Sequence, residues 1–516
     1  MDLVKNWPDA VVETSPPLRT PDARRGTSAV MILGVAIGAV VLSLVSGSHT
    51  LVALIAVPIV VSMAWSNPEA MIALLPVWLV MLGFIRRITA GGSNVTFSGD
   101  PLLLIAPIAL LVLWIVATRS REPGRHTPLA RWILIFNVLA LLQAFNPSQG
   151  SLLTGLGGLL FVTIPTLAFW VGRKYAEPGL IMRIIWTVAI LSLVSACYGL
   201  YQQFVGWPSW DSNWIASKGY AALNVGNGVV RAFASFSSAQ EYAVFLSVGA
   251  VAWAALLSRS TRLPLLLHLS ALATILVALF YESQRTSVFL TALAFGVMGA
   301  ARLKMRPWNV ALAGTAAIAL LMVFAGAIGG SSTSCTNTQS ASCVLTQHQL
   351  SGITNPTGAN SSLSGHIAAT RKGVLSGFKH PLGRGTGAST LAAGKYSANN
   401  HFVGTEFDPG NMAIDFGVMG IVVYAMLLWT ALSTAYRFAV RRRDAPGLFV
   451  IGIAAATMFQ WANGDLYSVC WLIWLFFGFA DVLLAHDVAE EKAATPTFES
   501  FEWRRPGTGV RRDLAQ

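Results

Sequence analysis

Isolated arginines are the residues of this chain whose type and position could bind a charged ligand. Arg231 lies in NGVVRAFASF shortly before an apolar run, and Arg285 lies in YESQRTSVF between two apolar runs. Arg371 and Arg384 lie in the long polar segment that follows. A guanidinium group keeps its charge and binds phosphate through two parallel hydrogen bonds. These residues predict a site for a phosphorylated ligand, with contact to lipid headgroups as the alternative for each.

Acidic and imidazole side chains near the end of the polar segment could handle a proton. His401 and Glu406 precede a long apolar run, Asp408 stands at its start and Asp415 lies inside it. Glu406 is our first candidate for activating a hydroxyl group, because a partly buried Glu can have a raised pKa, and His401 is the second. The alternative is helix capping, since Pro409 suits a first helical turn. A membrane-buried Asp415 is a functional candidate or the partner of an arginine.

The elements that position these residues are mostly apolar. Of the 516 residues, 54% are hydrophobic and 11% are charged, whereas a soluble domain has about 25% charged residues. We therefore predict an all-α polytopic membrane protein. The net charge of +12 does not indicate a nucleic-acid partner, because the Lys and Arg residues lie at the ends of apolar runs. There they act as a topology signal.

Apolar runs predict about fourteen transmembrane helices. We expect them at 29–46, 51–65, 69–85, 101–118, 131–145, 153–171, 180–204, 241–258, 264–281, 287–301, 309–329, 411–437, 447–463 and 467–485.

The loops between these spans fall into a basic set and a set with few positive charges. Because basic loops face the cytoplasm, both termini are predicted to be cytoplasmic and the large loop to be extracytoplasmic. Five regions are expected: a disordered cytoplasmic tail (1–28), the N-terminal part of the bundle (29–329), the large loop with short helices (330–410), the C-terminal membrane helices (411–486) and a cytoplasmic tail (487–516).

The large loop contains two further predicted features. Cys335 and Cys343 lie on the oxidising side and are predicted to form a local disulfide, with free thiols as the alternative. The segment Ser364–Lys379 is predicted to form an amphipathic helix that ends before Pro381.

Three stretches of the chain resemble the O-antigen ligase/polymerase family of bacterial membrane glycosyltransferases. They are YESQRTSVFLTALAFGV, GHIAATRKGVLSGFKHPLGRGTG and the end of the large loop running into DFGVMGIVVY. The region RAFASFSSAQEYAVFL is similar to the segment before a helix in that family. The resemblance covers roughly 230–432.

The resemblance implies a GT-C-like helical bundle in the bacterial cytoplasmic membrane. It implies a metal-independent, inverting glycosyltransferase without a cofactor, which moves a glycan from undecaprenyl diphosphate to an acceptor hydroxyl at the outer face. Other polysaccharide export or assembly proteins are further implied partners. Arg285 and Arg371 would bind the diphosphate, with Arg231 or Arg384 as a third contact. Arg285, Arg371 and Glu406 would then converge in one outward-facing cavity.

The chain departs from the ligases of this family at one position. Those ligases carry a His, usually followed by Asn, about eleven residues before the first Gly of the last motif. Here that Gly is Gly417, and the matching position holds Glu406, whereas His401 lies five residues too early. This fits a polysaccharide polymerase better than a ligase. A secondary transporter or lipid flippase, and a scaffold within an assembly complex, are the alternatives.

Overall fold

The structure is a computed structural model that describes residues 49–89, 100–119, 127–218, 224–226, 228–257, 265–329, 340–355, 362–397, 404–462 and 466–494. Within these ranges the chain is almost wholly helical, which confirms the predicted all-α class. The β structure described is one antiparallel hairpin of β1 (Asn224–Gly226) and β2 (Val229–Val230). The predicted tail at 1–28 and the predicted span at 29–46 lie outside the described residues.

Ten described helical stretches are long and apolar enough to cross a membrane. They are α2 (His49–Ser66), α3 (Pro68–Thr89), η3 (Pro101–Leu104) continuing into α4 (Ile105–Arg119), α6 (Leu152–Lys174), α7 (Pro178–Phe204), α9 (Ala239–Leu257), α10 (Leu265–Glu282), α12 (Pro307–Gly329), α16 (Asp408–Arg442) and α18 (Tyr467–Ala494). Two shorter apolar helices are α5 (Pro128–Gln143) and α17 (Ala445–Ala456), and α11 (Arg285–Arg302) lies between α10 and α12 in the chain. This is the pattern of a polytopic membrane protein.

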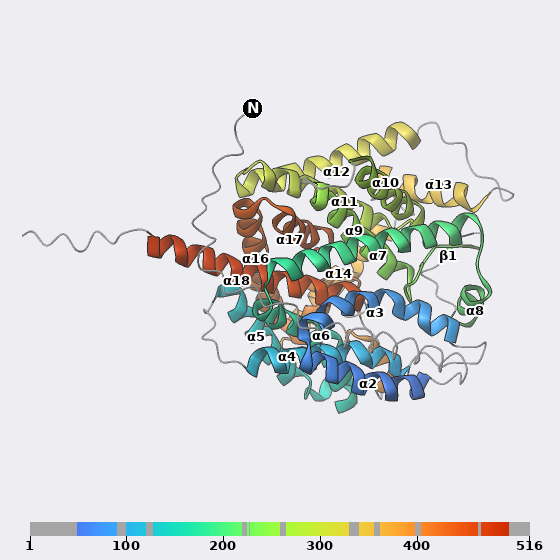
Figure 1. The fold of residues 1–516 in the computed structure, drawn as a ribbon. Helices are drawn as coiled ribbons and strands as arrows, with labels where there is room; N and C mark the ends of the chain where they lie inside the picture. Colours follow the sequence, from blue (N-terminus) through green and yellow to red (C-terminus); the bar gives the residue numbers. More distant parts are fainter. Residues whose placement is uncertain are drawn as a thin grey trace, which may run out of the picture.

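The helices lie side by side in a bundle (Figure 1). Helix α18 packs along α6, α11 packs against α12 and α17, and α9 contacts α7, α10 and α17. Among the candidate spans, α9 and α18 have the largest buried share, 78% each, so they form the centre of the bundle. In Figure 1, α18 projects beyond the body at one end, whereas α8 (Ser209–Lys218), β1 and α13 (Ala341–Thr354) lie toward the other.

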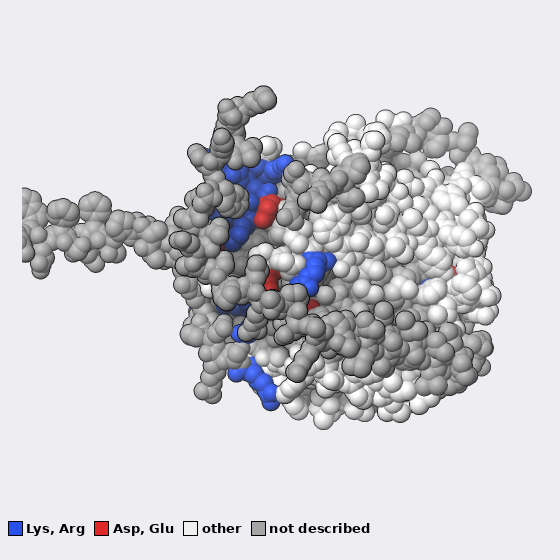
Figure 2. Space-filling view, in the orientation of Figure 1, with Lys and Arg blue, Asp and Glu red and all other residues white. Residues whose placement is uncertain are grey.

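Charge is distributed unevenly between these two ends. Figure 2 shows that the Lys and Arg side chains described on the visible face gather near the end from which α18 projects. Toward the other end the visible described surface is nearly free of them. This asymmetry is the one that membrane topology produces.

Short helices fill the part of the chain that was predicted as the large loop. They are α13, α14 (Ser362–Lys379) and α15 (Leu391–Tyr396). Helix α14 matches the predicted amphipathic helix, and it ends before Pro381 as expected. Cys343 is disulfide-bonded and Cys197 and Cys470 are free, while Cys335 lies outside the described residues.

Two helix boundaries near the C-terminal end differ from the sequence prediction. The helix expected at 447–463 ends at Ala456, and further along the backbone the amides of Trp461 and Ala462 donate to the Asp408 carboxylate instead of to helix carbonyls. Residues 487–494, predicted as the start of a tail, continue helix α18.

A kink in α16 anchors the loop that follows α14. Gly417 has a φ of 65°, in the left-handed region, and the amide of Val418 donates to the Pro381 carbonyl at 3.2 Å. The backbone amide of Arg384 donates to the carbonyl of Ile414 at 2.9 Å. Asp415 accepts hydrogen bonds from the amide and hydroxyl of Ser389, at 2.8 and 2.7 Å. The deepest predicted carboxylate therefore fixes this loop to α16.

Substituting Gly417 by Ala should destabilise the protein by more than about 1 kcal/mol. The positive φ disfavours any side chain, and a Cβ atom would overlap the Pro381 carbonyl oxygen. We expect a lower midpoint of thermal unfolding for the detergent-solubilised protein. Gly326→Ala in α12 is the control, because no atom lies within 4 Å of its Cβ position. Equal midpoints for the two variants would contradict this account of the kink.

Candidate functional site

The four predicted arginines fall into two groups in the structure. Arg371 and Arg384 line one open groove along α14. Arg231 and Arg285 lie near each other at the start of α11, together with Glu282 and His348. No contact between the two groups is described. The prediction that Arg285 and Arg371 bind one diphosphate, with Arg231 or Arg384 as a third contact, therefore stays a prediction.

The α14 groove has a volume of about 620 Å³. Its lining residues recur every three or four positions, which is the spacing of a single helix face. They are Ser364, Ile367, Ala368, Arg371, Lys372, Leu375, Ser376, Lys379, His380 and Arg384. The groove thus combines four permanent cations with aliphatic side chains, and no Asp or Glu is among its lining residues.

The opposite face of α14 holds the helix in place. A Cβ atom at Gly373 would lie 2.9 Å from the Cα atom of Gly410 in α16, and one at Gly377 would lie 2.9 Å from the Cβ atom of Ala413. Only glycine permits so close an approach of the two backbones. Packing of this face against α16 directs the cationic face of α14 outward. At the far end, the backbone bond from Arg384 to α16 fixes the loop that carries its side chain.

Glu406 lies beside α14 but outside the lining of the groove. Its carboxylate pairs with Nδ1 of His366 at 3.0 Å, and half of its side chain is exposed. His366 precedes Arg371 by five residues on the same helix, which places the two on different sides of α14. Helix capping does not explain Glu406, because the N-cap of α16 is Phe407. His401 lies outside the described residues.

The second group, which we call the Arg285 cluster, consists of Arg231, Glu282, Arg285 and His348. Arg285 opens α11 and donates from Nη2 to the carbonyl oxygen of His348 at 2.8 Å. Its guanidinium group packs so tightly on α13 that a Cβ atom at Gly352 would overlap it. Arg231 lies 3.7 Å from the fully buried carboxylate of Glu282. Both arginines are therefore engaged by protein groups.

The pKa of His348 shows how closely the cluster is gathered. It is lowered from an ordinary 6.5 to about 4, first by burial and then by the charges of Arg285 and Arg231. An imidazole so close to two cations stays neutral at physiological pH. His348 was not singled out in the sequence, because nothing local to TQHQL marks it as the partner of an arginine 63 residues away.

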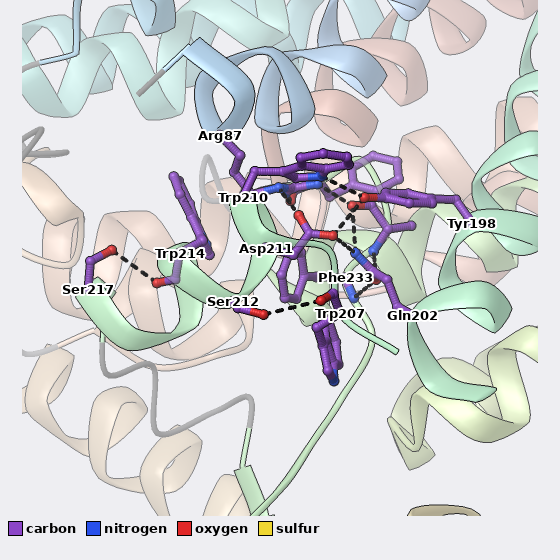
Figure 3. Close-up of polar contacts among 12 residues, drawn as sticks. Arg87, Tyr198, Gln202, Trp207, Trp210, Asp211, Ser212, Trp214, Ser217 and Phe233 are labelled. Carbon is purple, nitrogen blue, oxygen red and sulfur yellow. Dashed lines mark hydrogen bonds and ion pairs between the residues drawn. The ribbon is translucent and has the colours of Figure 1, made fainter. Parts of the chain in front are cut away.

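A further buried network involves two arginines that the sequence analysis did not single out, Arg86 and Arg87. Arg87 Nε lies 2.7 Å from Asp211, and its guanidinium group also donates to backbone carbonyls of Ala234 and Phe236. Figure 3 shows Asp211 between Arg87 and the side chains of Tyr198 and Gln202, which donate to it at 2.6 and 2.7 Å.

Arg86 makes the equivalent pair beside this network. Its Nε donates to Asp100 at 2.6 Å, and Asp100 also contacts His49 at 3.1 Å. The only sequence signal for these pairs is the presence of two adjacent arginines at the end of an apolar run. Their partners, Asp100 before η3 and Asp211 in α8, cannot be identified from spacing. The two ion pairs fix η3 and α8 against the bundle, and the hydrogen bonds of Arg87 to backbone carbonyls fix the segment before α9.

Lowering the pH from about 7 to about 5 should loosen α13 from the Arg285 cluster. When α13 is undocked, His348 would have its ordinary pKa of 6.5, whereas in docked α13 its pKa is about 4. Because the undocked state binds a proton more readily, falling pH weakens docking. Hydrogen exchange in 341–354, corrected for the intrinsic pH effect, should therefore accelerate several-fold. His348→Gln should exchange with a flatter pH dependence. Identical pH profiles for both proteins would refute this role of His348.

Comparisons with known proteins do not add to these assignments. No family model matches the chain, and no curated protein matches it. The functional interpretation therefore rests on the chemistry of the groove and the cluster themselves.

Proposed function

We propose that this protein is a membrane glycosyltransferase of the O-antigen ligase/polymerase type. It moves a glycan from an undecaprenyl-diphosphate carrier to an acceptor hydroxyl at the outer face of the cytoplasmic membrane, as a polysaccharide polymerase. One observation carries the proposal. The α14 groove presents Arg371, Lys372, Lys379 and Arg384 beside aliphatic side chains, and the lining residues that the structure describes include no carboxylate.

Such a groove suits a ligand that is both anionic and lipidic. Guanidinium groups bind phosphate oxygens in pairs, and the lysines add positive charge. The exposed side chains of Ile367 and Leu375, at 55% and 48%, offer an apolar surface next to these cations. A water-soluble anion would gain nothing from this apolar surface, whereas a polyprenyl diphosphate gains from both.

The proposed topology has about fourteen spans and both termini in the cytoplasm. The basic end of the bundle in Figure 2 would face the cytoplasm, and the end with α8 and α13 would face outward. No nucleotide is needed at that face, because the diphosphate is already a good leaving group.

The reaction divides its tasks among these residues. The acceptor oxygen attacks the anomeric carbon as the bond from that carbon to the diphosphate oxygen breaks. Arg371 and Arg384 stabilise the charge that develops on the departing undecaprenyl diphosphate. The acceptor proton passes to the Glu406 carboxylate, which His366 holds at 3.0 Å. Because Glu406 lies outside the groove lining, the acceptor would have to approach from that side of α14. Arg285 would become available to the same diphosphate only after α13 leaves it, whereas Arg231 is held beside Glu282 of α10.

Replacing both Arg371 and Arg384 by Ala should reduce polymer formation by at least about a hundredfold, since each charged hydrogen-bonding group contributes about 1.5–3 kcal/mol. Gel and mass analysis of lipid-linked glycans in a complemented deletion strain should show single repeat units accumulating. Arg437→Ala, which removes an exposed arginine of α16 outside the groove, should leave polymer unchanged. Polymer of normal length and amount from the double variant would reject the proposed role of the groove.

Glu406→Gln should lower kcat by about 10²–10⁴ while KM for the donor changes little, because a general base acts in the transition state. The measurement is a rate assay with purified protein and lipid-linked donor. Glu177→Gln is the matched control, as Glu177 is exposed before α7 and makes no capping bond. An unchanged kcat would exclude Glu406 as the base.

A further inference from the structure

A second pocket lies where the end of α7, α8 and the β1–β2 hairpin meet, and we call it the hairpin pocket. Its volume is about 500 Å³, within the roughly 300–1,000 Å³ of typical small-molecule sites. It is lined by Gln202, Gln203, Phe204, Val205, Gly206, Trp207, Ser212, Ile215, Ala216, Gly228, Val229, Val230 and Ala341. None of these lining side chains is charged.

The walls of the hairpin pocket are held rigidly. Gln202 accepts from the amides of Phe233 and Ala234, at 3.2 and 2.8 Å, and donates to Asp211. The Trp207 ring stacks on Phe233 with 5.3 Å between centroids. Figure 3 shows Trp207 extending from this network on the side away from Arg87. A preformed wall loses little freedom when a ligand binds.

Gln203 provides the polar feature that points to a ligand. Its Oε1 atom is buried and has no hydrogen-bond partner among the residues that the structure describes. A buried amide oxygen without a partner costs about 1–3 kcal/mol. Gln203 also lines the pocket. A turn of its side chain that brings this oxygen to the pocket surface would let a ligand hydroxyl remove the penalty, whereas an acyl chain would not.

The hairpin pocket adjoins the Arg285 cluster on two sides. Val230 lines the pocket and directly precedes Arg231. Phe204 also lines it, and its ring packs at 4.9 Å on Tyr281, which directly precedes Glu282. Because both arginines of the cluster are engaged by protein groups, the ligand of this pocket has to be inferred from its uncharged lining.

We propose that the hairpin pocket binds an uncharged sugar unit of the glycan. The proposal rests on the glycosyltransferase function proposed above and specifies how it recognises its substrate. A sugar ring has an apolar face of C–H groups that can lie against Trp207 and Ile215. Its hydroxyl groups can donate to Gln203 and to the open backbone at Gly206 and Gly228, where nothing lies within 4 Å of the Cβ positions.

The test is saturation-transfer NMR on the full-length protein in a detergent without a sugar headgroup. The probes are the methyl glycosides of glucose, galactose, mannose and N-acetylglucosamine, with hexanol as the apolar probe. At least one glycoside should receive saturation from the protein. Gln203→Leu should lower that signal at least about fivefold, equivalent to about 1 kcal/mol, and Ala216→Trp should abolish it by filling the pocket.

Ala311→Trp is the matched control, because Ala311 is exposed on α12 and lines neither the hairpin pocket nor the α14 groove, so glycoside binding should stay intact. Binding that persists in Ala216→Trp would overturn the proposal. Saturation transfer to none of the four glycosides would overturn the proposal as well. So would saturation transfer to hexanol alone. The measurement needs no turnover, so it tests sugar binding independently of polymer formation. A protein that binds a glycoside but forms no polymer would support this proposal and contradict the proposed function.

Discussion

The cost of burying a charge divides the arginines of this protein into those that are paired with protein groups and those that face a groove. An arginine at the end of an apolar bundle must find an acid or a carbonyl, because an unpaired buried charge is far costlier than a paired one. Arg87 forms an ion pair with Asp211, Arg86 with Asp100, and Arg231 with Glu282. The arginines of the α14 groove face no acid among the lining residues that the structure describes, and Arg384 contacts the imidazole of His380 at 3.0 Å.

The sequence predicted what depends on local pattern. Apolar runs located most of the described helices, and the amphipathic pattern of Ser364–Lys379 together with Pro381 predicted α14 and its end. The sequence could not predict that α17 ends at Ala456 or that the amides of Trp461 and Ala462 donate to Asp408, because that contact depends on tertiary packing. The length of an apolar helix and the residues that end it are determined by local sequence. The partners of polar side chains are determined by the tertiary structure.

The candidate site was predicted in part for the same reason. Arg371, Arg384 and Glu406 were identified as candidates by residue type. The shared groove of Arg371 and Arg384, and the pairing of Glu406 with His366 of α14, depend on the tertiary structure. Arg285 was likewise identified by residue type. Its hydrogen bond to the His348 carbonyl depends on how α13 folds back onto α11. Helix α13 also supplies Ala341 to the hairpin pocket, so one short helix contacts both regions.

The placement of cations along α14 has a consequence for the motion of a bound headgroup. Arg371 and Lys379 are eight residues apart on one face, which is about 12 Å along the axis. This distance is longer than a single phosphate group, and Lys372 and Arg384 add positive charge along the same track. A lipid-borne anion could therefore pass from one cation to the next along the helix, so that arrival and departure need not take place at the same point.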